Sequence, residues 1–263
     1  MNQLALLLDI ARFNVMKSLA YPWELAAFFA RKIIYLLFLS FFWFAVSKSS
    51  STALNFKQLI AYFLLSTAVL NLVFANSSPF AKYIFRRIRN GDLSNFLIRP
   101  LPTISFLFSS FFGENLMNIV YAFITTAISI VLVPPHGILN LALFVVFIVF
   151  ALFTSISINI LIASLSFYFV EVNGIKNSFD HIRTILSGSI IPLTMFPPAI
   201  SKIVMYTPFP LLAFTPTYVL QNSLPIYEIL QMLLVAVVWS SGLFALMLLA
   251  WNKSIKRYEG VGI

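Results

Sequence analysis

The residues with the most chemistry to offer lie in one short segment, residues 79–101, between two long apolar runs. Its charged and turn-forming members are Lys82, Tyr83, Arg86, Arg87, Arg89, Gly91, Asp92 and Arg99. Elsewhere in the chain polar residues are scarce. Such a concentration of charge between membrane-like runs indicates where a membrane protein meets a soluble partner, so it bears on function more directly than any apolar run.

The pattern within this segment predicts a basic helix, a turn and a stiff return. Residues 80–90 form the short amphipathic helix of this prediction. Gly91 suits a helix end with positive φ, and Asp92 can then cap a second short turn. The Arg99-Pro100 pair stiffens the return, because proline fixes its own φ and restricts the residue before it. A loop that only satisfies the positive-inside rule explains the charge, but not this arrangement.

A second group of polar residues, Glu114, Asn115 and Asn118, falls about ten residues into a later apolar run. A charged side chain at the centre of a membrane helix costs about 2.5–3.5 kcal/mol on insertion scales. We therefore consider two roles for Glu114. It either lines a translocation path or a dimer interface, or it is protonated or satisfied by a neighbouring helix near the cytoplasmic boundary.

Other polar or amphipathic residues have plainer interpretations. Asn159 lies within an apolar run, where one amide can pair with another helix. Trp239 also lies deep in an apolar run and is a candidate for helix packing or substrate contact. A short loop with a solvated face, or a second contact with a soluble partner, is expected from Glu171, Lys176, Asp180, His181 and Arg183.

Several kinds of chemistry are excluded by the sequence. The chain has no Gly-Lys pair, so the phosphate-binding pattern G-x-x-x-x-G-K-[ST] is absent. It has no cysteine, and its two histidines, His136 and His181, are far apart, so we expect no metal site. A net charge of +9 raises the question of nucleic acid, but the basic residues flank apolar runs instead of forming a stripe. The chain is not expected to be a self-contained enzyme.

The composition is that of an integral membrane protein. Hydrophobic residues make up 60% of the chain and charged residues 10%, with a mean hydropathy of +0.95. A soluble domain carries about a quarter charged residues. With no long hydrophilic region left over, residues 1–263 form one all-α membrane domain in contact with lipid.

Long continuous runs favour helices over a β-barrel, and a span needs about 20 mostly apolar residues. Six spans are expected on that basis. They cover Leu25 to Val46, Gln58 to Ala75, Thr103 to Val133, Ile138 to Val170, a fifth from about Ile182 that is broken by Gly188, Pro192, Pro197 and Pro198, and Ile226 to Trp251.

The basic residues set the expected orientation. With the N-terminus in the cytoplasm, only Lys48, Lys57 and Lys202 of the 17 basic residues lie outside. This is the imbalance that the positive-inside rule requires, so both termini and residues 79–101 are expected in the cytoplasm. Residues 2–20 are predicted to form an amphipathic helix in the cytoplasmic interface, with an ordinary surface helix as the alternative.

The charged segment also carries a family resemblance. Residues 88–93 and 97–101 resemble the IRxGDL…LxRPL signature of ABC transporter permeases of the exporter-type six-span class, in the branch often encoded as paired permeases. Further matches are spread over nearly the whole chain. They are Phe167-Tyr168, Ser187–Leu193 with Phe196-Pro197, Thr207-Pro208-Phe209, Trp239, and a tail from Arg257 to Gly262 in which Gly-Val-Gly replaces the usual Gly-Gly.

The resemblance implies a half-transporter in a bacterial cell membrane that pairs with a second copy or a sister permease. Two separate ATPase subunits would bind ATP and Mg and dock from the cytoplasm. In this family the segment between spans two and three is the coupling helix, so the residues named at the outset become the expected ATPase contact. The broken fifth span corresponds to re-entrant helices on the outer side. Export of a drug-like, amphiphilic or peptide substrate is the expected activity.

A different class of protein gives the alternative. A secondary transporter, channel or scramblase would work without an ATPase. It would show coupling-ion carboxylates at the bilayer midplane, or two similar halves of three spans each. Glu114 is the one clear candidate carboxylate, and the two halves show no convincing repeat.

Overall fold

The chain folds into a bundle of helices, and no strand occurs among the residues that the structure describes. The structure is a computed structural model that describes residues 3–49, 55–75, 79–98, 102–169 and 171–258. Its first six helices are α1 (Gln3–Leu19), α2 (Pro22–Ser49), α3 (Phe56–Leu72), α4 (Pro79–Arg89), α5 (Ser94–Leu97) and α6 (Thr103–Glu114). The others are α7 (Leu116–Leu132), α8 (Ile138–Ser164), α9 (Asn173–Leu186), α10 (Pro198–Met205), α11 (Phe214–Gln221) and α12 (Ile226–Ser254).

Three helices, α2, α8 and α12, are long and apolar enough to cross a membrane, and a fourth span results if α6 and α7 are counted together. The 17 residues of α3 cover roughly 25 Å, which is less than the hydrocarbon core of a bilayer. The all-helical membrane class is therefore confirmed for the described residues, while the six-span layout stays a prediction.

Two pairs of long helices make the body of the bundle. The α3–α7 pair contains small buried residues, Ala61 and Ala122, and Ser129 Oγ donates a hydrogen bond of 2.7 Å to the Ala61 carbonyl. Between α8 and α12 the buried residues Ala151 and Ala236 lie in one apolar cluster. Small residues let helix backbones approach closely. In a membrane, helices associate through such close packing, because the hydrophobic effect does not drive them together in lipid.

The expected third span is not one straight helix. It bends by 62° between α6 and α7. Asn115 lies at the bend, where its side-chain amide donates to the Phe111 carbonyl at 2.9 Å. Only α7 therefore continues along the bundle, and α6 turns away to pack beside α1.

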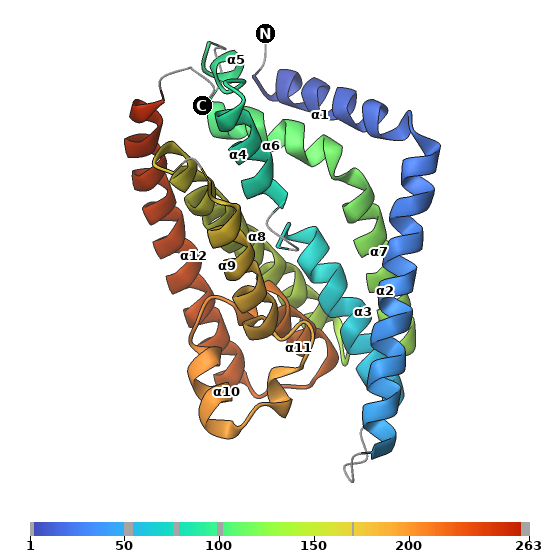
Figure 1. Ribbon diagram of the computed structural model, residues 1–263. Helices are drawn as coiled ribbons and strands as arrows, with labels where there is room; N and C mark the ends of the chain where they lie inside the picture. The colour runs from blue at the N-terminus through green and yellow to red at the C-terminus, as the bar shows by residue number, and fades with distance from the viewer. Residues whose placement is uncertain (1–2, 50–54, 76–78, 99–101, 170, 259–263) are drawn as a thin grey trace.

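The fifth span also differs from the prediction. Helix α9 begins at Asn173, about nine residues before the predicted start at Ile182, so residues expected in a loop form a helix. After α9 the chain breaks into the short 3-10 helix η2 (Leu193–Met195), α10, the 3-10 helix η3 (Pro210–Leu212) and α11. These pieces gather at the end of the molecule opposite α1 and α4 (Figure 1).

Helix α1 runs crosswise to α2 and packs along α6. The predicted helix of residues 2–20 is thus present as Gln3–Leu19, and its place at a membrane surface stays a prediction. The contact depends on Gly113, because a Cβ atom there would lie 2.3 Å from the Ala11 carbonyl oxygen and 2.8 Å from the Asn14 Cβ.

Replacing Gly113 by Ala should force α1 and α6 apart and lower the free energy of unfolding by about 1–3 kcal/mol, the usual cost of overpacking. Gly242→Ala in α12 is the matched control, because a Cβ at Gly242 meets nothing within 4 Å. It should be neutral or stabilising by up to about 1 kcal/mol. Thermal unfolding of both variants in detergent checks this, and equal melting temperatures would contradict the close contact.

Candidate docking site at the basic end

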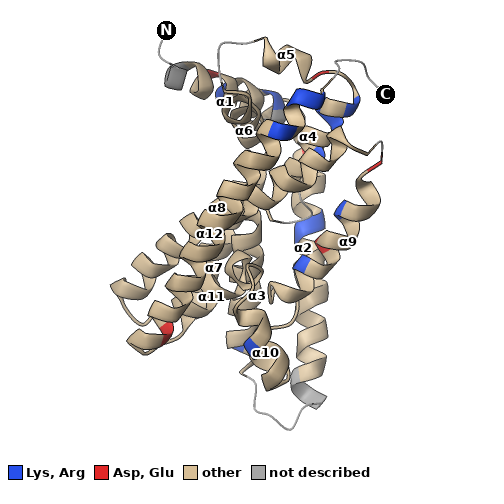
Figure 2. Cartoon of the chain, turned by 90° about the vertical axis from the view of Figure 1, so that its left-hand side faces the viewer, with Lys and Arg blue, Asp and Glu red and all other residues tan. Residues whose placement is uncertain are grey.

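Lys and Arg concentrate at the end of the molecule that carries α1, α4, α5 and the last turn of α12, which we call the basic end (Figure 2). Helix α4 contributes most of this charge. Its apolar residues Phe80, Ala81, Ile84 and Ile88 are buried against the core cluster that includes Phe111 and Ile158.

The opposite face of α4 is exposed and basic. Lys82, Arg86 and Arg89 recur at spacings of four and three residues, which places them on one face of a helix, and all three are exposed. Arg89 lies 3.8 Å from Glu171, but both side chains are more than half exposed, so this ion pair contributes little. The face is therefore available to a partner.

Arg87 has a different position from the other basic residues of α4. Its guanidinium lies 4.7 Å from the ring centre of Tyr83 and 4.9 Å from that of Phe96 in α5, and it donates to the Tyr83 hydroxyl at 3.0 Å. Burial raises the pKa of the Tyr83 phenol; Arg87 opposes this shift and Glu114 adds to it. Arg87 thus holds α5 against α4 instead of extending outward.

The turn between α4 and α5 is built on Gly91, whose φ of +75° lies in the left-handed region that favours glycine. Helix α5 has Leu93 as its N-cap and no side-chain cap, so the expected capping by the Asp92 carboxylate is wrong. Arg99 lies outside the described residues.

Three segments far apart in the sequence meet at this turn. The Tyr258 hydroxyl donates to the Gly91 carbonyl at 2.7 Å. The Tyr258 ring packs edge-on to Phe167, which lies in the 3-10 helix η1 (Leu165–Phe167) after α8. Arg257 stacks over the neighbouring Tyr168 at 4.7 Å. The sequence gives each of these residues as part of a separate motif, and the fold brings the motifs together.

A groove of about 690 Å³ opens beside the turn, between α1, α4, α5 and α6. Its lining mixes carboxylates, amides and aromatic rings. It includes Asp9, Asn14, Tyr83, Asp92, Asn95 and Phe96. Because both apolar and polar groups line the groove, it can bind a segment of another protein next to the basic face of α4.

The polar group of the third run lies at the bend between α6 and α7. Glu114 is exposed at the last residue of α6, not ten residues into a straight span. Asn118 donates to the Asn115 side chain at 3.1 Å. A role for Glu114, Asn115 and Asn118 in a translocation path or interface stays a prediction.

Trp239 ties α12 to the broken segment. Its indole nitrogen donates to the Tyr206 carbonyl at 2.7 Å, and Gln231 donates to the Tyr206 hydroxyl at 2.6 Å. The helix therefore holds the residue that follows α10, which is the packing role considered for Trp239; substrate contact stays a prediction.

The glycine and prolines of the fifth run stand at its breaks. Gly188 follows α9 with φ +76°, and its carbonyl accepts a hydrogen bond from Tyr62 at 2.6 Å. Pro192 precedes η2, and Pro197 and Pro198 begin α10. Gly188 and Pro192 are buried, as irregular chain at membrane depth requires, whereas Pro197 and Pro198 are exposed.

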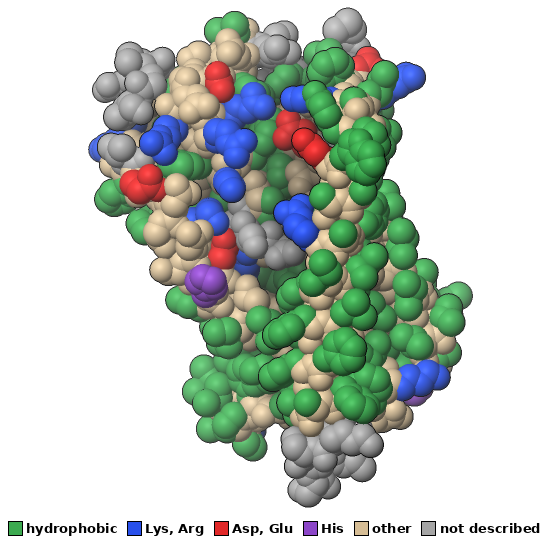
Figure 3. Space-filling view, turned by 45° about the vertical axis from the view of Figure 1, so that its right-hand side comes forward, with side chains coloured by type: hydrophobic (Ala, Val, Ile, Leu, Met, Phe, Trp, Pro, Cys, Tyr) green, Lys and Arg blue, Asp and Glu red, His purple; other side chains and the backbone are tan. Residues whose placement is uncertain are grey.

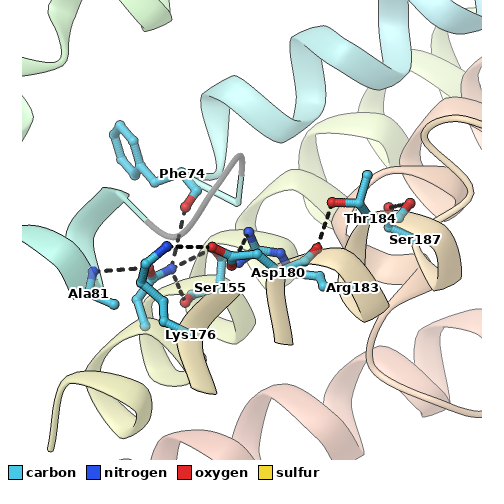
Figure 4. Close-up of polar contacts among 9 residues, drawn as sticks. Phe74, Ala81, Ser155, Lys176, Asp180, Arg183, Thr184 and Ser187 are labelled. Atoms are coloured by element: carbon cyan, nitrogen blue, oxygen red, sulfur yellow. Dashed lines mark hydrogen bonds and ion pairs between the residues drawn. The ribbon is translucent and has the colours of Figure 1, made fainter. Parts of the chain in front are cut away.

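The expected solvated loop of residues 171–183 is wrong. Lys176, Asp180 and Arg183 follow one face of α9 and are buried, with Arg183 only 1% exposed. Asp180 bridges the two cations, at 2.9 Å from Lys176 Nζ and 2.8 Å from an Arg183 guanidinium nitrogen (Figure 4). The spacing of four and three residues in the sequence was the signal for one helical face, and it was overlooked.

Asn159 of α8 joins the chain after α3 to the start of α4 through Phe74 and Ala81, which Figure 4 shows near Lys176. Its amide nitrogen donates to the Phe74 carbonyl at 3.3 Å, and its oxygen accepts from the Ala81 backbone nitrogen at 3.1 Å. The amide thus bonds backbone at a helix junction, where the sequence suggested pairing with another helix.

Lys32 is a polar anchor that the sequence analysis did not single out. It lies in α2, where its ammonium donates to the Asn71 side chain at 2.7 Å and lies 5.1 Å from the ring centre of Tyr121. A lysine inside an apolar run was the available signal.

On the face of the molecule drawn in Figure 3, charged side chains gather around a hollow in the half nearer the basic end.

A family described as ABC-2 family transporter protein matches residues 17–262. No curated protein matches the chain.

The buried ion-pair group predicts an asymmetry between two acidic residues. Asp180→Asn leaves Lys176 and Arg183 with one countercharge fewer in a buried site, so the free energy of unfolding should fall by about 3–5 kcal/mol. Glu171→Gln, at an exposed pair, should change it by less than about 0.5 kcal/mol. Thermal unfolding of both variants provides the measurement, and an Asp180→Asn variant as stable as Glu171→Gln would refute the assignment.

Proposed function

The chain belongs to the ABC-2 family of transporter proteins, and from that membership we propose that it is the membrane subunit of an ATP-driven exporter whose separate ATPase subunits dock at the basic end. Membership itself makes the chain a permease subunit that associates with ABC ATPases. The site of docking and the direction of transport belong to the proposal.

The observation that carries the proposal is the division of α4 into two faces. Its apolar face is buried in the core, while Lys82, Arg86 and Arg89 are exposed on the other. A helix that is fixed on one side and presents fixed charge on the other can transmit force from a docked protein. The groove beside Asp92 and Asn95 provides the adjoining contact area.

ATP and Mg are assigned in this proposal to the partner ATPase. The permease contributes the path, as a dimer with a second copy or with a sister permease, and the cargo is a drug-like, amphiphilic or peptide substrate. The polar residues on the buried face of α9 lie inside the bundle. Their presence there supports a translocation path that admits polar groups.

Orientation follows from the charges. The basic end carries the start of α1, the end of α12 and the exposed residues of α4 (Figure 2). Lys202 of α10 lies at the opposite end. The positive-inside rule then places the basic end and both termini in the cytoplasm of a bacterial cell, with the multi-pass body in the cell membrane.

The alternative of a self-sufficient transporter receives no support from the described residues. The buried carboxylate among them, Asp180, is paired with two cations, so it is not poised to take a coupling ion.

Removing charge from the α4 face should weaken ATPase docking. Lys82→Ala combined with Arg86→Ala is expected to lower the affinity about tenfold, or about 1.4 kcal/mol. The measurement is purification of the tagged chain from its native membranes in nanodiscs, with mass spectrometry to identify the ATPase and its stoichiometry. Titration with that purified ATPase then gives the affinity.

Lys253→Ala with Lys256→Ala is the matched control, because it removes the same charge from exposed positions at the end of α12. This control should bind the ATPase within about twofold of the wild type, apart from nonspecific electrostatic effects that salt screens. Equal losses in both double variants would show that net charge, not the α4 face, matters. Transport by a chain that purifies with no ATPase would overturn the proposed function.

A further inference from the structure

The hydroxyl of Tyr258 makes three polar contacts with the turn between α4 and α5. It donates to the Gly91 carbonyl at 2.7 Å, accepts from the Ser94 backbone nitrogen at 3.2 Å, and lies 3.1 Å from Ser94 Oγ. Tyr258 is 164 residues from Ser94 in the sequence. One group at the end of the last helix is thus bonded to both sides of the turn.

Helix α5 depends on such outside help. It has four residues, and its N-cap Leu93 makes no side-chain hydrogen bond. The first backbone N–H groups of a helix have no partner within it, and so short a helix is unstable by itself. The Ser94 N–H donates to the Gly91 carbonyl at 3.3 Å, and the Tyr258 hydroxyl, from a distant part of the chain, supplies a second acceptor at 3.2 Å.

The ring of Tyr258 is fixed by contact with another aromatic ring, which in turn packs on a third. It packs edge-on to Phe167 with ring centres 6.3 Å apart, and Phe167 packs edge-on to Trp251 at 5.8 Å. Trp251 is 4% exposed and belongs to the core cluster of α4, α6 and α8. The position of the hydroxyl is therefore set by the ends of α8 and α12.

A second set of contacts fixes α5 through the side chain of Phe96. Phe96 packs edge-on to Phe106 of α6 with ring centres 4.9 Å apart and carries the Arg87 guanidinium on its face. Arg87 thus connects α5 to α4, Phe96 connects α5 to α6, and Tyr258 connects the turn to the ends of α8 and α12. Leu93 of the turn is buried in the same core cluster as Trp251, and the tyrosine adds hydrogen bonds from the turn to the end of the chain beyond α12.

We propose that Tyr258 is a positioning residue for coupling: its hydroxyl fixes the Gly91 turn to the ends of α8 and α12, so that movement of the docked α4–α5 segment reaches the long helices. This inference rests on the proposed function. It assigns the end of α12 a part in transmitting force, beyond the docking face of α4. Tyr258 touches neither substrate nor nucleotide in this scheme.

Tyr258→Phe tests the inference, because it removes the hydroxyl and keeps the ring contact with Phe167. Two measurements apply. Hydrogen exchange of the chain in nanodiscs, followed in peptides covering residues 90–98, should be about two- to tenfold faster at Ser94, the range that one neutral hydrogen bond gives. In the reconstituted complex, transport per ATP hydrolysed should fall by a similar factor, at unchanged melting temperature and ATPase stoichiometry.

Tyr168→Phe is the matched control. Its hydroxyl lies in the same aromatic group, accepts a hydrogen bond from Ser254 Oγ at 3.4 Å, and makes no hydrogen bond to the turn among the described residues. It should leave both the exchange rate and the transport ratio as in the wild type. A purely structural role for Tyr258 would lower yield and melting temperature without changing transport per ATP.

The two measurements separate the inference from the function on which it rests. Wild-type exchange at Ser94, or a wild-type transport ratio, in Tyr258→Phe would overturn the positioning role. Absence of any ATPase from the purified wild-type complex would overturn the proposed function instead, while the exchange measurement would still report whether Tyr258 holds the turn.

Discussion

The fold depends on one constraint: inside a bilayer every backbone N–H and C=O needs a partner within the protein. The described chain departs from regular helix at several places, and at three of them a side chain supplies the partner. Tyr62 bonds the Gly188 carbonyl after α9. Asn140 donates to the Val219 and Asn222 carbonyls at the end of α11, and Asn159 bonds the junction of α3 and α4. Scarce polar residues are thus placed where helices stop.

Buried charge follows the same logic on α9. Lys176, Asp180 and Arg183 are costly to remove from water, and their mutual ion pairs offset that cost. Lys176 lines a small void with Ala81 of α4 and Ala163 of α8. One of the buried charges of α9 therefore lies beside the helix that carries the exposed basic face.

The sequence predicted the all-helical membrane class, the charged segment and its family, because composition and local motifs determine these. It failed where contacts between distant segments decide. The bend at Asn115 interrupts a run that composition presents as one span, and beyond it α6 packs on α1 through a close contact at Gly113. Burial of Arg183 is different, because its partner Asp180 is only three residues away and the spacing of the two was a local signal. The meeting of Tyr258, Phe167 and Gly91, by contrast, depends on three separate parts of the chain.

Adjacent arginines on α4 have consequences for how such a protein diversifies. Arg86 is exposed, whereas Arg87 lies between two aromatic rings, so we expect the two adjacent positions to tolerate substitution to different degrees. Changes at Lys82, Arg86 and Arg89 alter the outer surface and leave the interior intact. If an ATPase docks on this face as proposed, a duplicated copy of the gene needs only a few surface substitutions to bind a different ATPase. It needs no compensating mutations in its core.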